Sequence, residues 1–105
     1  MLELESKSQY KQLTNNGVVI VLFTADWCPD CRFIEPDLPD IEAAFTDYTF
    51  IKVDRDKFID ICEENDIMGI PSFLAYKDGD VVGRLVNKDR KTKEEIEQFI
   101  ENLSK

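Results

Sequence analysis

The chain has no histidine, and among its 105 residues it has only three cysteines, four glycines, four prolines and one tryptophan. Without histidine it cannot build a Ser/His/Asp triad, a Cys/His protease dyad or a histidine metal site. The side chain that most often transfers protons near neutral pH is therefore absent. Any chemistry must depend on other residue types.

Long apolar runs and an excess of positive charge are missing too. The longest apolar run covers residues 18–23, whereas a membrane-spanning helix needs about 20 apolar residues. The N-terminus is polar and lacks the basic start and apolar stretch of a secretory signal. We therefore expect no membrane segment and a cytoplasmic location. The formal net charge of −9 disfavours nucleic acid and anionic membranes as partners.

The length predicts a single domain over residues 1–105, because domains usually contain roughly 100–200 residues. A hydrophobic content of 43% is enough for one core, and disorder is not expected. No internal repeat or linker interrupts the chain. A monomer is the simplest expectation for the oligomeric state.

Two hydrophobic periods alternate along the chain. Runs of β-branched and aromatic residues predict strands at residues 18–24, 49–54, 72–76 and 81–86, with a very short edge strand near residues 2–4. Helical spacing predicts helices at residues 6–15, 29–45 and 57–65, and a last helix after Thr92. Strand–helix–strand units imply parallel pairing, and Asp78-Gly79 predicts an antiparallel hairpin. The expected fold class is α/β, a mixed central β-sheet flanked by helices on both faces.

Local signals refine the predicted helices. Ser6 with Gln9, and Thr92 with Glu95, have the spacing of capping boxes. Pro36 lies inside the long helix over residues 29–45 and is expected to kink it, because proline removes a backbone donor. The apolar residues that recur at helical spacing in that helix are Phe33, Ile34, Leu38, Ile41, Ala44 and Phe45.

The motif that carries chemistry is Cys28-Pro29-Asp30-Cys31, which follows the buried strand. Proline favours the first position of a helix, so Cys28 is the predicted N-cap residue. Its sulfur can accept a hydrogen bond from the Cys31 N–H, and the helix dipole favours a thiolate there. Cys28 is therefore the predicted nucleophile. Cys31, the more buried thiol, would resolve the mixed disulfide that Cys28 forms.

Two other interpretations of the cysteine pair are open. One is a permanent disulfide, which a reducing compartment disfavours. The other is a zinc or iron–sulfur site with Cys62 as a third ligand, which carboxylates would have to complete. Cys62 itself fits either a buried free cysteine or a regulatory thiol. We expect no metal.

Four motifs in this order resemble the thioredoxin family. Residues 23–32, Phe-Thr-Ala-Asp-Trp-Cys-Pro-Asp-Cys-Arg, are similar to its active-site segment, and Pro36 matches its helix-kinking proline. Residues 69–72, Gly-Ile-Pro-Ser, match its cis-proline loop, and residues 77–80, Lys-Asp-Gly-Asp, match the hairpin that follows. The resemblance covers essentially the whole chain. The Trp-Cys-Pro-Asp-Cys form is similar to a thioredoxin-related branch of the family.

The resemblance implies the thioredoxin fold, dithiol–disulfide exchange and a cis bond before Pro71. It implies no bound cofactor, because the dithiol itself carries two electrons. It also implies disulfide substrates, either proteins or small molecules, and a flavoprotein thioredoxin reductase as the electron donor.

One departure from the family pattern concerns proton transfer. The positions of the family's buried aspartate and of the lysine that accompanies it hold Leu22 and Phe50. The usual proton acceptor for the Cys31 thiol is therefore missing. Asp26, Asp30 or water would have to replace it.

Three residues are expected to tune the site: Asp26, Pro29 and Asp30. Pro29-Asp30 stands where the family usually has Gly-Pro between the cysteines. Asp30, in the first helical turn, either complements the helix dipole or tunes the thiols. Asp26 is either a solvated turn residue or a base.

Four residues are expected at the substrate site. Trp27 would form one wall of it, or pack against its neighbours, and both can hold. Ile70 and Pro71 would offer backbone to an extended substrate segment. Asn87, at the position of a family glycine, would line the same groove.

The sequence thus predicts a thiol–disulfide oxidoreductase that reduces disulfides by Cys28 attack and Cys31 resolution. The alternatives are a thioredoxin-like module that binds partners with little turnover, a disulfide oxidase or isomerase, and a metal-binding domain. An oxidase differs from a reductase only in redox potential. Protein disulfides, cystine-like small disulfides and peroxide-handling partners all stay open as substrates.

Overall fold

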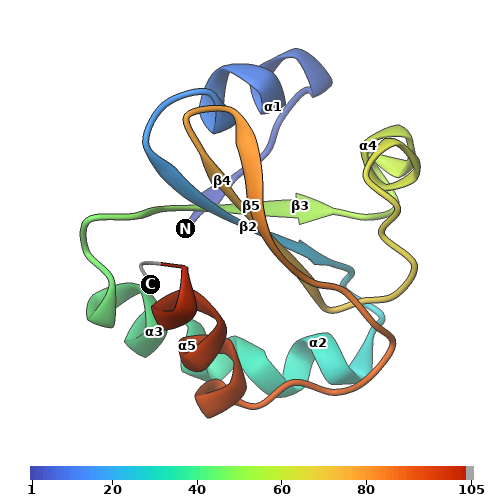
Figure 1. Ribbon diagram of the computed structural model, residues 1–105. Helices are drawn as coiled ribbons and strands as arrows, with labels where there is room; N and C mark the ends of the chain where they lie inside the picture. The colour runs from blue at the N-terminus through green and yellow to red at the C-terminus, as the bar shows by residue number, and fades with distance from the viewer. Residues whose placement is uncertain (104–105) are drawn as a thin grey trace.

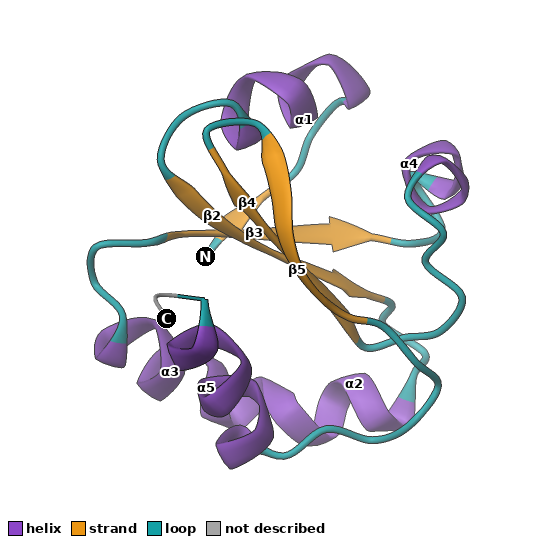
Figure 2. Cartoon of the chain, in the orientation of Figure 1, coloured by secondary structure: helices purple, strands orange, loops and turns teal. Residues whose placement is uncertain are grey.

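The computed structural model describes residues 1–103, which form a five-stranded sheet with helices on both faces (Figures 1 and 2). The strands are β1 (Leu2–Glu3), β2 (Val18–Thr24), β3 (Thr49–Asp54), β4 (Ser72–Lys77) and β5 (Asp80–Leu85). The helices are α1 (Lys7–Thr14), α2 (Pro29–Ile34), α3 (Leu38–Ala44), α4 (Ile59–Glu64) and α5 (Lys93–Asn102). A 3₁₀ segment, Glu35–Asp37, joins α2 to α3.

The sheet is mixed, as the sequence predicted. Its strand order is β1-β3-β2-β4-β5. The central strand β2 runs parallel to β3 and antiparallel to β4, and β5 pairs antiparallel with β4. Since helices cover both faces of β2, its sequence is almost continuously apolar.

Helices lie on both faces of the sheet (Figure 2), and a cluster of buried hydrophobic side chains fills the space on each face. Alternate β2 residues point to opposite faces, so Val19, Val21 and Phe23 pack with α1 and α4. Ile20 and Leu22 pack on the other face, in the cluster that includes residues of α2, α3 and α5. Helix α2, which begins at the cysteine motif, is therefore held against the sheet from one side.

The prediction of one continuous, kinked helix over residues 29–45 was wrong. The segment is broken into α2, the 3₁₀ segment and α3. Pro36 lies in the 3₁₀ segment, because it has no N–H to continue the α-helical bonding. Phe33 and Ala44 are exposed, whereas Ile34 and Ile41 are buried as their spacing predicts.

The predicted starts of the first and last helices are confirmed by their caps, whereas α4 begins at Ile59, two residues later than predicted. Ser6 Oγ accepts from the Gln9 N–H at 3.3 Å, and Thr92 Oγ1 accepts from the Glu95 N–H at 3.1 Å. The Gln9 side chain accepts from the Glu5 N–H at 2.8 Å instead of from Ser6, so the first capping box is only half formed.

Segments that are distant in the sequence meet at the carboxyl ends of β2 and β3. Because β2 and β3 are parallel, they end at the same edge, where antiparallel β4 begins and β5 ends. The cysteine motif follows β2, residues 69–71 precede β4, and residues 87–91 follow β5. Within residues 1–103, no helix has the length and apolar character needed to cross a lipid bilayer.

Candidate active site

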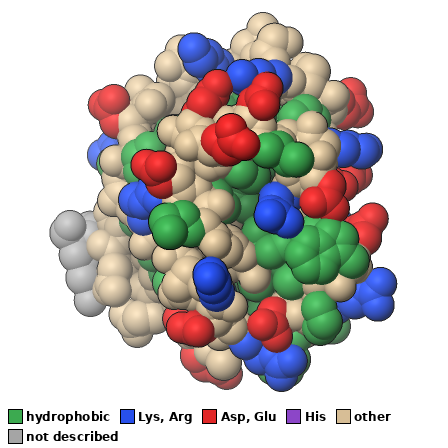
Figure 3. All heavy atoms as spheres, turned by 90° about the vertical axis from the view of Figure 1, so that its right-hand side faces the viewer, with side chains coloured by type: hydrophobic (Ala, Val, Ile, Leu, Met, Phe, Trp, Pro, Cys, Tyr) green, Lys and Arg blue, Asp and Glu red, His purple; other side chains and the backbone are tan. Residues whose placement is uncertain are grey.

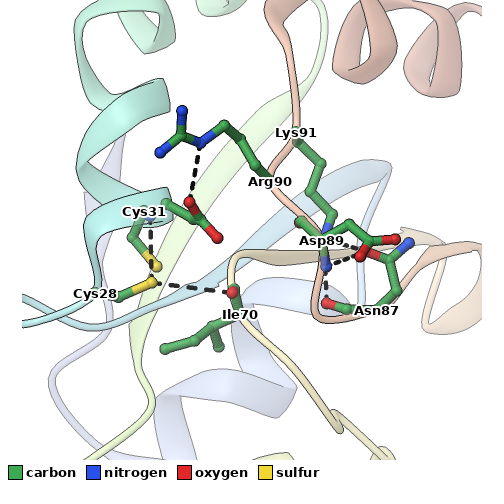
Figure 4. A network of polar contacts seen from close by, with 8 residues as sticks. Cys28, Cys31, Ile70, Asn87, Asp89, Arg90 and Lys91 are labelled. Atoms are coloured by element: carbon green, nitrogen blue, oxygen red, sulfur yellow. Dashed lines mark hydrogen bonds and ion pairs between the residues drawn. The ribbon is translucent and has the colours of Figure 1, made fainter.

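Cys28 is the N-cap residue of α2, as predicted. Its Sγ accepts a hydrogen bond from the Cys31 N–H at 3.2 Å (Figure 4). Pro29 begins the helix. The Cys28 N–H donates to the Ala25 carbonyl at 3.2 Å, which fixes the turn between β2 and α2. The accepted N–H and the helix dipole both favour negative charge on the Cys28 sulfur.

Cys31 is the more buried member of the pair, with 1% of its surface exposed against 5% for Cys28. Burial, followed by the hydrogen bond with Cys28, raises the pKa of the Cys31 thiol to about 11, although contacts with Thr24 and the Ala25 backbone lower it. Cys31 is therefore a neutral thiol near pH 7. Both cysteines are free thiols here.

A groove of about 360 Å³ opens beside Cys28; we call it the Cys28 groove. Its lining residues are Trp27, Cys28, Pro29, Asp30, Arg55, Ile67, Met68, Gly69, Ile70 and Lys88. The Cys28 Sγ lies 3.9 Å from the Ile70 carbonyl oxygen (Figure 4), and the bond between Ile70 and Pro71 is cis. Pro71 is buried, whereas Ile70 is partly exposed.

Trp27 stands at the rim of this groove with 58% of its surface exposed. Its Nε1 donates to Asp56 Oδ2 at 2.7 Å, and the Arg55 guanidinium lies 5.8 Å from the ring centre. These contacts hold the ring in place while leaving most of it open to solvent. The position fits a wall of the groove better than a packing residue.

The loop over residues 87–91 lies against residues 69–71. A Cβ on Gly69 would come within 2.5 Å of the Asn87 carbonyl oxygen, so only glycine allows this close approach. Lys88 lines the Cys28 groove, whereas Asn87 lines an adjoining hollow with Met68. Asn87 does not have a positive φ; its Oδ1 accepts from the Asp89 N–H at 2.9 Å.

Lys91 anchors this loop from inside the protein. Its side chain is completely buried, and its Nζ donates to Asn87 Oδ1 at 2.7 Å, Asn87 O at 3.1 Å and Asp89 O at 2.7 Å (Figure 4). All three ammonium donors are thus used. Burial lowers the pKa of Lys91, while the charges of Glu95, Asp89, Asp30 and Cys31 oppose that shift.

The two candidate carboxylates have different surroundings. Asp30 Oδ1 receives a hydrogen bond from Arg90 Nε at 2.9 Å, and the Arg90 guanidinium lies 4.3 Å from the Phe33 ring centre. Asp26 is exposed; its backbone carbonyl accepts from Arg32 Nε at 2.9 Å. Its carboxylate has no hydrogen bond or ion pair with residues 1–103.

The positions of the family's buried acid and lysine are apolar in three dimensions as well. Leu22 and Phe50 lie in the cluster between the sheet and helices α2, α3 and α5, with 2% and 6% of their surfaces exposed. This layer supplies no proton acceptor to Cys31 at these two positions.

The metal interpretation has no support within residues 1–103, where no group of three or more Cys, Asp or Glu residues is arranged to hold an ion. Cys62 lies on α4, in the cluster on the opposite face of the sheet from α2. It is buried, and burial raises the pKa of its thiol. Of the two interpretations of Cys62, the structure therefore fits a buried free cysteine rather than a regulatory thiol.

Sequence reasoning did not assign six residues to the site: Arg55, Ile67, Met68, Lys88, Arg90 and Lys91. A signal was available for the last three. In a hairpin, the loop after the second strand returns to the edge where the first strand began. That loop contains three cations in an acidic chain, and this edge is where the cysteine motif lies.

Fold and site together define a class: small α/β proteins in which a Cys-x-x-Cys motif begins a helix beside a cis-proline loop. A family model described as thioredoxin matches residues 1–102 of the chain. The chain is 36% identical to thioredoxin Asp f 28 of Aspergillus fumigatus in an alignment that covers 90% of the chain and 86% of that protein. It is 37% identical to thioredoxin H-type 1 of Nicotiana tabacum, over 93% of the chain and 77% of that protein.

Solved structures agree with this. The oxidised thioredoxin of Plasmodium falciparum superposes with a TM-score of 0.84 at 30% identity, covering 100% of the chain and 99% of that structure. The thioredoxin of Trypanosoma brucei brucei superposes with a TM-score of 0.89 at 22% identity, covering 99% of the chain and 90% of that structure. At this identity it supports the fold alone.

The chain belongs to the thioredoxin family. It is a thiol–disulfide oxidoreductase, a disulfide reductase that acts through its own dithiol without a cofactor. A binding module with little turnover and a disulfide oxidase or isomerase are not favoured.

Proposed function

We propose that Cys28 is the attacking thiol of this reductase and that Cys31 is the resolving thiol. The observation that carries the assignment is the hydrogen bond from the Cys31 N–H to the Cys28 Sγ at 3.2 Å, at the N-terminus of α2. It favours negative charge on Cys28. Cys31, with a pKa of about 11, keeps its proton until the second step.

In the first step the Cys28 thiolate attacks one sulfur of a substrate disulfide. A Cys28–substrate disulfide forms, the substrate S–S bond breaks, and the other substrate sulfur leaves as a thiolate that takes a proton from water. In the second step Cys31 loses its proton, and its sulfur attacks the Cys28 sulfur. The substrate leaves as a dithiol, and two electrons have passed from the protein, which now holds a Cys28–Cys31 disulfide.

The neighbouring residues are assigned by position. Trp27 and Ile70 line the Cys28 groove and would contact substrate, with Pro71 shaping the loop and Asn87 supporting it from the adjoining hollow. Pro29 begins the helix whose dipole acts on Cys28.

Water is the proposed proton acceptor for Cys31. The Asp26 carboxylate makes no hydrogen bond or ion pair with residues 1–103, and the Asp30 carboxylate is paired with Arg90. Asp26 and Asp30 would therefore tune the charge around the thiols rather than take the proton.

A flavoprotein thioredoxin reductase is the proposed electron donor, and the cytoplasm the proposed location. The family supports the first proposal, and the low cysteine content supports a reducing compartment. We also propose that the chain acts as a single-domain monomer, which its one sheet between two helical layers supports.

Trapping the mixed disulfide tests the two roles. Cys31→Ser should accumulate a covalent adduct with a disulfide peptide, because the second attack is removed, and mass spectrometry detects the adduct. Cys28→Ser should form no adduct and lose turnover. Cys62→Ser is the matched control and should keep turnover. Turnover by Cys28→Ser, or an adduct on Cys31 of the native protein, would contradict the assignment.

A further inference from the structure

The Cys28 groove has a charge opposite to that of the protein as a whole. The chain has 22 acidic and 13 basic residues. The groove lining nevertheless contains two cations, Arg55 and Lys88, and a single acid, Asp30. A lining drawn at random from this chain would be acidic on balance.

The negative charge of Asp30, the acid in the groove lining, is balanced by Arg90, which lies outside the lining. Arg90 donates to the Asp30 carboxylate at 2.9 Å and stacks on the Phe33 ring, which fixes its position. An ion pair at this distance cancels most of the negative charge that Asp30 would otherwise project into the groove.

The two cations are less compensated. Arg55 pairs with Asp56 only at 3.8 Å, and that carboxylate also accepts the Trp27 N–H. Lys88 is exposed and has no hydrogen bond or ion pair with any of residues 1–103. The acids Asp66 and Asp89 line the adjoining hollow with Lys88, not the groove itself.

Figure 3 shows the face of the molecule where α4, the start of α2 and the loop after β5 lie. Hydrophobic side chains gather across its middle with basic side chains beside them, and acidic side chains stand mostly around this area. Trp27 and Met68, 58% and 77% exposed, contribute apolar surface at the groove.

The occupant that fits is an extended polypeptide. The Ile70 carbonyl is 3.9 Å from the Cys28 sulfur, and the Ile70 backbone makes no other hydrogen bond within residues 1–103. An extended chain can therefore pair with this backbone as strands do. Arg55 follows β3 and Lys88 follows β5, the strands that flank β2 and β4 in the sheet. The substrate side chains beside the reacting cysteine would then come near Arg55 on one side and Lys88 on the other.

We propose that the Cys28 groove selects disulfide-bearing polypeptides that carry an acidic side chain next to the reacting cysteine. This deepens the proposed function and rests on it. Attraction to Lys88 and Arg55 assists the first step, because it holds the substrate sulfur at the Cys28 thiolate and favours encounter with the correct partner.

Matched peptides test the selection. Three symmetric disulfide-linked peptide dimers differ only in the residue next to cysteine, which is Glu, Gln or Lys. The second-order rate constant of a single turnover with the reduced protein is measured at 0.15 M salt. The Glu peptide should react about two- to fivefold faster than the Gln peptide, which corresponds to the free energy of an exposed charge pair. The Gln peptide should react faster than the Lys peptide. In 1 M salt the preference should vanish, because the screening length falls to about 3 Å.

Charge reversal locates the effect. Lys88→Glu should reverse the order of the Glu and Lys peptides, and Lys88→Gln should weaken the preference for Glu. Lys77→Glu is the matched control: it changes the net charge equally, but Lys77 ends β4 at the far edge of the sheet. It should keep the native preference.

The outcomes separate this inference from the proposed function. Equal rates for the three peptides, or a preference that Lys77→Glu reverses as much as Lys88→Glu, would overturn the selection. The uncharged bis(2-hydroxyethyl) disulfide reports the redox activity alone. If the native protein reduces neither this compound nor any of the three peptides, the proposed function fails; if it reduces the three peptides at equal rates, only the selection fails.

Discussion

Lys91 is the residue whose environment is least expected from its type. Lysine is almost never fully buried unless paired, and within residues 1–103 Lys91 is the only charged side chain that is buried. Its ammonium is matched by three backbone and side-chain oxygens at 2.7 to 3.1 Å rather than by a carboxylate. The charge is thus used to hold the loop over residues 87–91 in one conformation.

Lys91→Met keeps most of the apolar stem of the side chain and removes its three hydrogen bonds. We expect the free energy of unfolding to fall by roughly 1–3 kcal/mol, because the oxygens of Asn87 and Asp89 lose their partner. Urea denaturation measures this. Lys93→Met, an exchange at the start of α5, is the control and should change stability little.

The same variant has a pH signature. The pKa of Lys91 is lowered in the folded protein from 10.5, mainly by burial. The unfolded chain therefore binds more protons just below pH 10.5, so the contribution of Lys91 to stability rises with pH there. The deficit of Lys91→Met relative to the native protein should widen between pH 8 and 10. A deficit that narrows would contradict this account.

At the scale of elements, the groove depends on the contact between two loops from different strands. Gly69 precedes β4, and residues 87–91 follow β5. Because a Cβ at Gly69 would meet the Asn87 carbonyl carbon at 2.6 Å and the Lys88 Cα at 2.8 Å, backbone rather than a flexible side chain would have to move.

Gly69→Ala should therefore displace residues 87–88 and reduce both stability and peptide-disulfide reduction. We expect a stability loss of more than about 3 kcal/mol, beyond ordinary overpacking. Gly17→Ala is the comparison: Gly17 has a φ of +71° but no atom within 4 Å of an added Cβ. It should cost about 1–2 kcal/mol and keep the activity per folded molecule. Equal losses of activity in both variants would argue against a role for the loop contact.

At the scale of the whole molecule, burial of weak acids makes stability depend on alkaline pH. Burial raises the pKa values of Cys31, to about 11, and of Cys62, Tyr10 and Tyr76. The Tyr10 and Tyr76 hydroxyls also share a hydrogen bond of 2.8 Å. Above about pH 9 the unfolded chain loses protons that the folded protein keeps, so stability falls as pH rises.

Cys62→Ala isolates one of these groups. At pH 7.5 the variant should be less stable by about 1 kcal/mol, because it leaves a small cavity under α4. At pH 10 this deficit should shrink, because the native protein alone loses the contribution of a thiol with a raised pKa. Urea denaturation in the presence of a reductant measures both values. A deficit that grows with pH would contradict the burial argument.

Local patterns along the chain were enough to predict the order and type of nearly every element and the chemistry of the cysteine motif. These depend on interactions between near neighbours: strand and helix periods, capping by Ser6 and Thr92, and proline at the first turn of α2. For the same reason the hydrogen bond from the Cys31 N–H to Cys28 could be predicted. The break at Pro36 was predicted only as a kink, because whether a helix bends or ends there depends on packing against the sheet.

The surroundings of the Cys28 sulfur, in contrast, depend on how distant segments pack together. Arg55, Lys88 and Arg90 come from loops after two different strands, and their distances to the groove depend on strand order and register. Lys91 has a residue type that is almost always exposed, yet it is buried here. The charge and the burial of a site depend on contacts between residues that are distant in the chain, so a local sequence pattern does not predict them.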